Sequence, residues 1–476
     1  MTYEPVIGLE VHVQLKTATK AFCGCANLFG SKENSHTCPV CLGLPGALPV
    51  FNEKALKSGV KVALALNCAV RTFTKFDRKN YYYPDLPKNF QISQYDVPFA
   101  QTGSLEIQAR EGRRLVKIKR VHLEEDAGKL IHAEDGPYSL VDYNRAGTPL
   151  LEIVTEPDLF SPQEAYDYLT DLKLILQYLD VSDCDMEKGT LRCDANVSLR
   201  PAASQTLGTK TELKNMNSFK AVKMALDYEI RRQADVLAEG GRILQETLLW
   251  DEKKQATHSM RSKEEAHDYR YFPEPDLPPF VMTTSEIEEI RKELPELPEE
   301  KRRRFTRDFG LSRKDSETLT ASVRLADFFE ACVNLSAEPK KTANWLIGPV
   351  SFQMNSRNQD ITQLRLSPSA LMELIDLAET GKISQLAAKD VLQEMLETGE
   401  KPSRIVEEKN LGQVSDSSVL KTVIEQVLAA HQKSVADYQS GKENALMFLV
   451  GQVMRASGGK ANPKTARQLL IERLKP

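Results

Sequence analysis

The sequence predicts an α+β protein in which a large mixed domain is followed by helical domains. Up to about residue 290, short runs alternate apolar with polar residues at the two-residue period of strands, interleaved with turn residues and a few amphipathic helices. From about Ser285 onward, apolar residues recur at helical spacing and strand patterns vanish. A chain of 476 residues is also too long for a single hydrophobic core, because domains rarely grow beyond about 250–300 residues. We expect domains over 1–290, 291–405 and 406–476.

Individual elements of the mixed domain follow from the same patterns. Strand-like alternation is clearest in five runs, 6–15, 114–123, 138–144, 191–200 and 210–213. One helix is predicted over 162–179, with Ser161 as its N-cap and Pro162 at its first position, where a missing N–H costs nothing. A second helix is predicted over 218–239.

Proline and glycine mark the irregular segments. The proline-dense stretch 271–280 is expected to be irregular, and its aromatic residues favour packing against the large domain. In the helical part we expect several short breaks, one of them at Gly348-Pro349, because proline removes a helical hydrogen bond.

The composition is that of an ordinary water-soluble globular protein. Hydrophobic residues make up 41% and charged residues 27% of the chain. The longest apolar stretches, such as 150–154 and 445–450, fall far short of the roughly 20 residues that cross a bilayer. The N-terminus lacks the basic start and apolar core of a signal peptide. These features favour the cytoplasm and argue against a membrane protein.

Four of the eight cysteines form a pattern typical of zinc sites. Cys23 and Cys25 have CxC spacing, and Cys38 and Cys41 have CxxC spacing. Four thiolates complete a tetrahedral zinc shell, so the site would be closed and structural, not catalytic. Redox-active thiols or plain packing are the alternatives.

Polar residues recur on one face of the first strand. Glu10, His12 and Gln14 are spaced two apart, so they project to the same side. Further polar runs carry His122, the acidic group Glu124-Glu125-Asp126, Asp142, Glu152, the alternating set Arg192, Asp194, Asn196 and Ser198, and then Lys210, Glu212, Lys214 and Asn217. Carboxylate oxygens are the ligands that Mg²⁺ prefers. Each face taken alone could simply be exposed to solvent, but together they favour a cation and phosphate site.

Two other segments suggest nucleic acid or nucleotide. The run 77–95 is aromatic and basic, which suits stacking on a base, although aromatic clusters more often belong to a core. The net charge of the chain is -4, yet residues 451–476 hold six basic residues, Lys460, Lys464 and Arg467 among them, and one acidic residue, a net of +5. Such a tail could bind phosphates or be a solvated helical face. Neither a Walker loop nor a Rossmann fingerprint is present.

Taken in order, these strings resemble one family over essentially the whole chain. The order of these segments is similar to that in the B subunits of aspartyl/glutamyl-tRNA amidotransferases. The segments are IGLEVHVQL, the cysteine pattern, KFDRKNYYYPDLPKNFQISQYD, HLEEDAGK, VDYNRAGTPLLEIVTEPD, LRCDANVSLR, ELKNMNSF and HDYRYFPEPDLPP. The resemblance implies a cradle-like catalytic domain at the N-terminus. It also implies an ATP-dependent transamidation of misacylated Glu-tRNA(Gln) or Asp-tRNA(Asn).

The implied reaction needs two partner proteins. A glutaminase, the A subunit, would supply ammonia, and the small C subunit would complete a heterotrimer. The B subunit would phosphorylate the side-chain carboxylate with ATP, and ammonia would then displace phosphate. Two rival interpretations are a free-standing ligase, which the lack of any amidase signature disfavours, and a tRNA-binding scaffold without catalysis. Which misacylated tRNA is natural stays open.

The resemblance also implies roles for residues. The metal site would be formed by Glu10, His12, Glu124 or Glu125, Glu152 and Asp194, with Mg²⁺ as the cation, or Mn²⁺, which tolerates an imidazole better. Glu10, His12 and Asp194 would be catalytic. Phosphate or substrate contacts would come from Lys79, Tyr81, Arg192, Lys214 and Asn217. Structural zinc would be held by Cys23, Cys25, Cys38 and Cys41.

Overall fold

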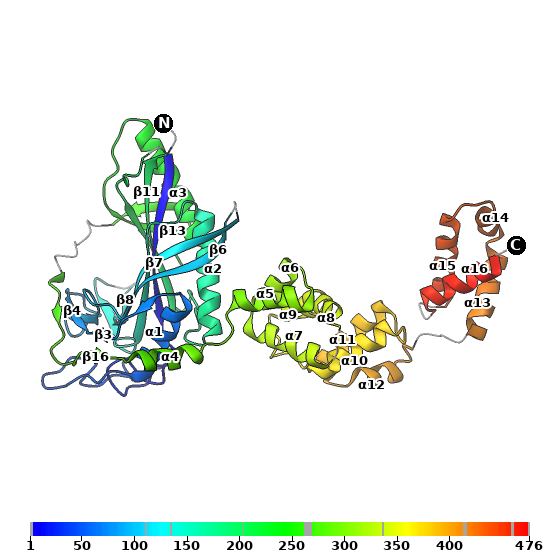
Figure 1. Cartoon of the computed structure of the whole chain (residues 1–476), viewed down its shortest axis with the longest axis horizontal. Helices are drawn as coiled ribbons and strands as arrows, with labels where there is room; N and C mark the ends of the chain where they lie inside the picture. The colour runs from blue at the N-terminus through cyan, green and yellow to red at the C-terminus, as the bar shows by residue number, and fades with distance from the viewer. Residues whose placement is uncertain are drawn as a thin grey trace. The chain divides into compact units, whose positions relative to one another are not determined.

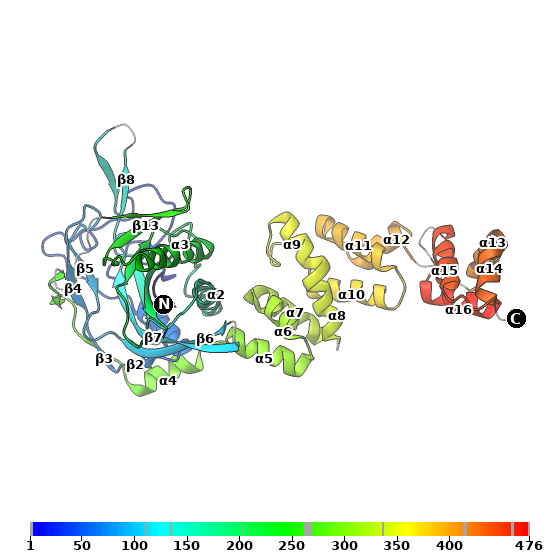
Figure 2. The same cartoon turned by 90° about the horizontal axis from the view of Figure 1, so that it is seen from above.

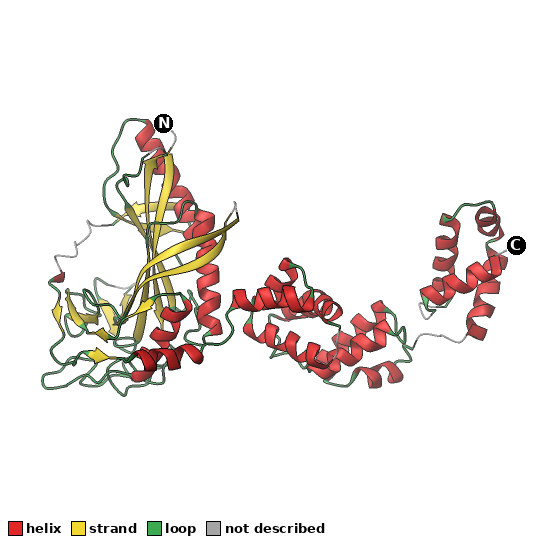
Figure 3. Cartoon of the chain, in the orientation of Figure 1, coloured by secondary structure: helices red, strands yellow, loops and turns green. Residues whose placement is uncertain are grey.

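The computed structural model describes residues 3–109, 112–133, 136–202, 204–260, 269–335, 338–412, 417–457 and 461–474. The chain divides into two units, Met1–Leu297 and Pro298–Pro476. The described strands all lie in the first unit, and the described part of the second unit is helical (Figures 1 and 3). The predicted α+β class is therefore confirmed.

A nine-stranded sheet organises the first unit. Its order is β14-β13-β12-β11-β1-β10-β7-β6-β2, and its pairs are antiparallel except β12 with β13. The strands are β1 (Tyr3–Gln14), β2 (Ala69–Val70), β6 (Ala100–Ala109), β7 (Gly112–Glu125), β10 (Pro149–Thr155), β11 (Leu191–Pro201), β12 (Thr211–Lys214), β13 (Thr247–Asp251) and β14 (Ala256–Ser259). The earliest strand, β1, thus lies near the middle, between β10 and β11.

The two faces of β1 are chemically different. Ile7, Leu9, Val11 and Val13 are fully buried in the main hydrophobic core. The alternating residues Glu10, His12 and Gln14 are only partly buried and occupy the opposite face, as the two-residue period requires. The sheet therefore has one apolar face and one polar face around its centre.

Three helices pack on the apolar side. These are α1 (Glu53–Ala65), α2 (Pro162–Tyr178) and α3 (Phe219–Ala238). Their N-caps are Asn52, Ser161 and Ser218, whose side chains accept hydrogen bonds from backbone N–H groups of the first turn. In Figure 2, α2 and α3 lie side by side against the sheet. Both helices lie where the sequence predicts them, within one residue at each end.

Smaller sheets complete the first unit. β15 (Phe272–Pro273), β4 (Asp77–Asn80) and β5 (Phe90–Ser93) form one, and β16 (Phe280–Val281) pairs with β3 (Phe73–Thr74). β8 (Lys129–His132) and β9 (Ser139–Asp142) form a hairpin that projects from the unit (Figure 2). The unit ends at Leu297 because α4 (Thr284–Lys292) packs on its core through Ile287 and Ile290.

The second unit holds two separate hydrophobic cores. The first core extends from Phe305 to Ile405, with Leu411 packed against it, and the second from Leu420 to Leu474. The helices of the first core are α5 (Pro298–Phe309), α6 (Arg313–Thr320), α7 (Val323–Leu335), α8 (Pro339–Trp345), α9 (Ser351–Arg357), α10 (Pro368–Glu379), α11 (Gln385–Thr398) and α12 (Pro402–Glu408). Those of the second core are α13 (Ser417–Ala430), α14 (Gln432–Gln439), α15 (Asn444–Ala456) and α16 (Pro463–Leu474).

The predicted break at Gly348-Pro349 is wrong. A π-helical segment, η2 (Leu346–Val350), joins α8 to α9 without interruption. A π turn widens the helix locally and changes which carbonyl faces the proline ring, so the helix continues past a residue that would otherwise end it. Among the described residues, no helix is long and apolar enough to cross a membrane.

Candidate active site

The register of the sheet gathers the polar residues of four strands on its polar face. Glu10 of β1 lies opposite Asp194 of β11. One step along, His12 lies between Arg192 of β11 and Glu152 of β10. Glu152 in turn lies opposite His122 of β7. Because paired residues point to the same side of a sheet, the alternation within each strand adds up to a single polar patch.

His12, Glu124 and Glu152 form the centre of this patch. His12 Nε2 lies 3.3 Å from Glu152 Oε2 and 3.9 Å from Glu124 Oε1. One ligand atom from each residue lies within 4.8 Å of the others, so the three could hold one metal ion. His122 Nε2 approaches the same two carboxylates at 3.7 and 3.5 Å. Both glutamates are buried.

The charges of this cluster depend on one another. Burial opposes ionisation of His12, but a hydrogen bond to Glu152 and the charges of Glu152, Glu124 and Asp194 raise its pKa to about 9. Burial also opposes ionisation of the two glutamates, yet His122 lowers the pKa of Glu124, and His122 with His12 lowers that of Glu152. Without a cation, the protonated His12 offsets part of the negative charge of the two carboxylates. A metal ion would take over that role from the proton on His12.

A second polar group lies beside the first. Asn196 Nδ2 donates to Glu10 Oε1 at 2.9 Å, and Lys214 Nζ donates to Asp194 Oδ2 at 2.6 Å. Lys214 also lies 3.7 Å from Glu212 Oε1. Glu10 and Asp194 are therefore held by an amide and an ammonium group.

Both groups open into one cavity of about 650 Å³. Its wall combines acids with five cations, Lys79, Lys119, Arg120, Lys210 and Lys214. The remaining lining residues are Glu10, His12, Ser93, Gln94, Tyr95, His122, Glu124, Glu152, Asp194, Glu212, Gln245, Tyr269 and Tyr271. Acids that can hold a divalent cation, surrounded by cations that can meet phosphate oxygens, are suited to a metal-bound polyphosphate.

The structure separates the two adjacent glutamates. Glu124 faces this cavity and accepts a hydrogen bond from Ser93 Oγ at 3.1 Å. Glu125 points to the other side, where it forms a buried ion pair with Lys88 and accepts from the Ile92 backbone N–H at 2.9 Å. It lines a different cavity, of about 240 Å³. Neighbours on a strand point apart, so only Glu124 can join His12 and Glu152.

The other predicted contacts are divided between the cavity and its surroundings. Lys79 and Lys214 line the cavity. The ring centroid of Tyr81 lies 5.7 Å from Lys79 Nζ, and the Tyr81 hydroxyl donates to Gln91 Oε1 at 3.1 Å. Arg192 forms an ion pair with Asp126 at 2.9 Å. Asn217 is exposed and is not among the residues that line the cavity.

Sequence reasoning missed part of the cavity wall. The sequence places His122 in the same polar run as Glu124, two residues apart, but gives it no role in the metal site. Tyr271 was expected only to pack against the large domain, and Tyr269 had no predicted role. Nothing local in the sequence indicates that these rings face the acids of β7 and β10, because that contact comes from the tertiary fold.

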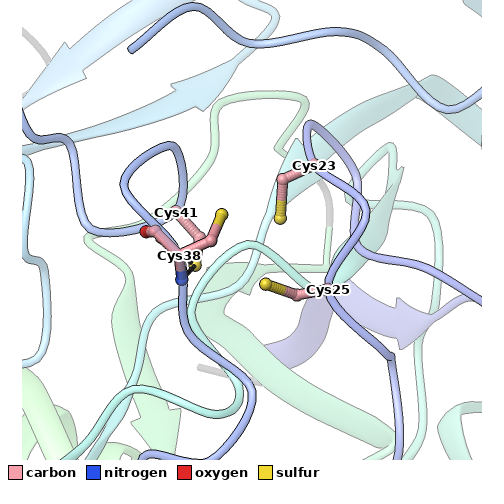
Figure 4. Close-up of side chains that lie close together, drawn as sticks. All are labelled: Cys23, Cys25, Cys38 and Cys41. Atoms are coloured by element: carbon pink, nitrogen blue, oxygen red, sulfur yellow. Dashed lines mark hydrogen bonds between the residues drawn. The ribbon is translucent and has the colours of Figure 1, made fainter.

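The four cysteines of the predicted zinc site come together. Cys23, Cys25, Cys38 and Cys41 place their sulfur atoms within 4.8 Å of one another, and the side chains converge from two loops (Figure 4). This arrangement could bind a metal such as zinc, which prefers four thiolates at about 2.3 Å.

Donors around Cys41 suit a thiolate. The Cys38 backbone N–H donates to Cys41 Sγ at 3.1 Å, and Lys20 Nζ, whose residue is fully buried, lies 3.7 Å from the same sulfur. The hydrogen bond from Cys23 is the main cause that lowers the pKa of Cys41, with Lys20 contributing through its charge. Cys41 is therefore prepared to act as an anionic ligand.

Two family models and several curated relatives match this chain over most of its length. The family model described as "GatB/GatE catalytic domain" matches residues 5–288, and that described as "GatB domain" matches 327–474. A protein of Moorella thermoacetica is 56% identical over 100% of both chains, and one of Carboxydothermus hydrogenoformans is 54% identical over 99% of both. A third, from a Thermoanaerobacter species, is 55% identical over 100% of both. All three are named as the B subunit of an aspartyl/glutamyl-tRNA(Asn/Gln) amidotransferase.

Proposed function

Because the chain belongs to the family of aspartyl/glutamyl-tRNA(Asn/Gln) amidotransferase B subunits, we propose that it carries out the ATP-dependent amidation of misacylated tRNA. Its substrates are Glu-tRNA(Gln), Asp-tRNA(Asn) or both. A carboxylate is a poor acceptor for ammonia because oxide is a poor leaving group. The side-chain carboxylate therefore takes the γ-phosphoryl group of ATP, ADP leaves, and ammonia then displaces phosphate from the acyl carbon.

The cluster of His12, Glu124 and Glu152 is the observation that carries this proposal. These three residues would hold Mg²⁺, or Mn²⁺, which accepts an imidazole ligand more readily. Glu10 and Asp194 would serve a second ion or the phosphates. A bound Mg²⁺ neutralises negative charge on a transferring phosphoryl group. The chain's own cations, Lys79 and Lys214 among them, would orient the phosphates, and Asn196 would keep Glu10 facing the cavity.

Partners and location complete the proposal. Ammonia comes from a glutaminase, the A subunit, while the small C subunit is the third member of the complex. The cysteines are all unpaired with one another, which suits the reducing cytoplasm. We propose that residues 1–290 form the catalytic domain with its structural zinc, 291–405 a helical domain, and 406–476 a small tRNA-binding domain.

The experiment is an ATP-consumption and amidation assay on the assembled complex, on this chain alone and on the partner subunits without this chain. With Glu-tRNA(Gln) or Asp-tRNA(Asn) we expect ATP hydrolysis to require the misacylated tRNA, and amide formation to require glutamine or added ammonium salt. A scaffold without catalysis would show ATP consumption independent of this chain. A free-standing ligase would use glutamine without any partner. Either result would contradict the proposal.

The basic tail gives a separate prediction for tRNA binding. Arg455, Lys464 and Arg467 are exposed on α15 and α16, while Lys460 lies outside the described residues. Deleting the chain from Asp416 onward should weaken tRNA binding and flatten its salt dependence, because fewer phosphates are neutralised. Binding isotherms at several salt concentrations measure both effects.

A finer variant tests whether charge is the cause. Replacing Arg455, Lys464 and Arg467 together by alanine should lower the salt slope by about one for each lost phosphate contact. Amidation at saturating tRNA should persist in both variants, because the acidic cluster lies wholly in the first unit. An unchanged dissociation constant with an unchanged slope would show that the tail is a solvated face.

A further inference from the structure

Three tyrosines form one wall of the acidic cavity, and we refer to Tyr95, Tyr269 and Tyr271 as the tyrosine wall. The rings of Tyr95 and Tyr271 stack in parallel, with centroids 4.2 Å apart and planes 9° apart. Tyr269 meets Tyr271 edge to face at 6.0 Å. Tyr95 is 45% exposed, so the part of its side chain that Tyr271 does not cover is accessible to a ligand. Neither the metal site nor the phosphate contacts described above use these rings.

The wall is built by two segments that flank β4. Tyr95 follows β5 and Tyr271 precedes β15, and both strands pair with β4 in the same small sheet. The Tyr95 backbone N–H donates at 3.0 Å to Asp77 Oδ2, and Asp77 is buried. The rings are therefore positioned from both sides of one strand.

A strained backbone position holds the second segment. Arg270, between the two wall tyrosines, adopts a left-handed conformation with φ of 42°, which L-residues rarely adopt. Asn80 Nδ2 donates to the carbonyl oxygens of Arg270 at 2.9 Å and of Tyr269 at 3.3 Å. Strain that neighbouring contacts maintain is typical of ligand sites, where it places side chains in advance of binding.

Lys79 lies between the wall and the acids. Its Nζ is 4.8 Å from the centroid of the Tyr269 ring. Burial opposes its charge, but Glu124, Tyr271, Tyr81 and Glu152 raise the pKa of Lys79 above its usual range. In the part of the chain that the structure describes, no carboxylate pairs directly with this ammonium group. A charged, unpaired lysine beside aromatic rings presents a phosphate-binding group next to a stacking surface.

We propose that the tyrosine wall stacks the adenine base of an adenosine nucleotide, so that the phosphates of ATP, or the esterified amino acid of a tRNA 3′-terminal adenosine, lie toward Lys79 and the acidic cluster. The proposal rests on the proposed function, which supplies two adenosines, that of ATP and that at the 3′ end of the tRNA. Every base has a π-face, and loss of one aromatic stacking partner weakens binding by about 5- to 150-fold.

The test uses two fluorescent probes and the full complex. One probe is the triphosphate of 2-aminopurine riboside, and the other is misacylated tRNA that ends in 2-aminopurine, a base whose fluorescence is quenched by stacking. The variants are Tyr95→Leu, which removes the ring, and Tyr95→Phe, which keeps it. Tyr82→Leu is the matched control, since Tyr82 is 75% exposed in the neighbouring segment and does not line the cavity.

We expect one probe to be quenched by the wild type, by Tyr95→Phe and by Tyr82→Leu. Tyr95→Leu should abolish that quenching and weaken binding of the same probe by about 5- to 150-fold. Quenching of the triphosphate identifies ATP as the source of the base, and quenching of the tRNA probe identifies the 3′-terminal adenosine.

Two outcomes would overturn the inference, namely no quenching of either probe by the wild type, or quenching that Tyr95→Leu leaves unchanged. Either can occur in a complex that amidates normally, so the inference can fail while the proposed function stands. The binding measurement needs no turnover. Quenching of the triphosphate would therefore support the wall even in a complex that did not amidate.

Discussion

Glu152→Gln is expected to reduce amidation by at least about 100-fold in the assembled complex, because it removes one charge from the centre of the acidic cluster. Glu152 contacts both His12 and His122 and lies opposite His12 in the sheet. Glutamine preserves the shape but provides a neutral ligand. Glutamine hydrolysis by the partner glutaminase and affinity for tRNA should be unchanged. Parallel assays of ATP consumption, amide formation and glutamine hydrolysis separate these effects.

Metal binding offers a readout of the same change that does not need turnover. Titration with Mn²⁺, followed by electron paramagnetic resonance, should show weaker binding to Glu152→Gln than to the wild type. Glu53→Gln is a suitable control, since Glu53 is an exposed acid in the first turn of α1. A thermal melt of each variant shows whether it is folded. The variants Glu10→Gln and Asp194→Asn independently test the polar group that lies beside the acidic cluster. Near-normal amidation by all three variants would mean that the phosphoryl-transfer site lies elsewhere.

Loss of the cysteine cluster is expected to have the largest effect on stability. Purified protein should contain about one zinc per chain, and Cys38→Ser should lower both the zinc content and the melting temperature. A closed thiolate site contributes its metal-binding free energy to folding, and each kcal/mol lost lowers the melting temperature of a unit this size by about 2–4 °C. We therefore expect a decrease of at least about 5 °C.

The structure supplies a matched control for the zinc experiment. Cys68 is a buried cysteine of the same unit that lies outside the cluster. Cys68→Ala should leave the zinc content unchanged, whereas a chelator should destabilise Cys68→Ala and the wild type but not Cys38→Ser. Zinc-free protein with an unchanged melting temperature would rule out a structural metal at this position.

The sequence predicts the fold class and the residue types of the site, because both depend on local periodicity. Alternation alone places Glu10, His12 and Gln14 on one face of β1, and helical periodicity, with Ser161 as the N-cap of α2, places α2 and α3. The convergence of these faces depends on strand order and register. β1 pairs with β10 and β11, which are more than 100 residues away, and no local pattern encodes that choice.

The remaining differences also have physical causes. The choice between Glu124 and Glu125 depends on how β7 pairs with β10, so the sequence could only leave it open. The tyrosine wall needs Tyr95 and Tyr271 to meet across β4, a contact between distant segments. At Pro349 the general rule that proline ends a helix was overridden by the π turn.

The alternation of Glu124 and Glu125 at the end of β7 constrains how this protein can change by insertion or deletion. The two carboxylates belong to two different cavities, yet they are consecutive residues of one strand. Inserting or deleting one residue in β7 would shift the register and exchange the faces of both side chains. Glu125 would then no longer form its ion pair with Lys88, and Glu124 would no longer contact the histidines of the acidic cluster. Length changes are therefore expected to be tolerated in the β8–β9 hairpin that follows, whereas a change within the last residues of β7 would disrupt both cavities at once.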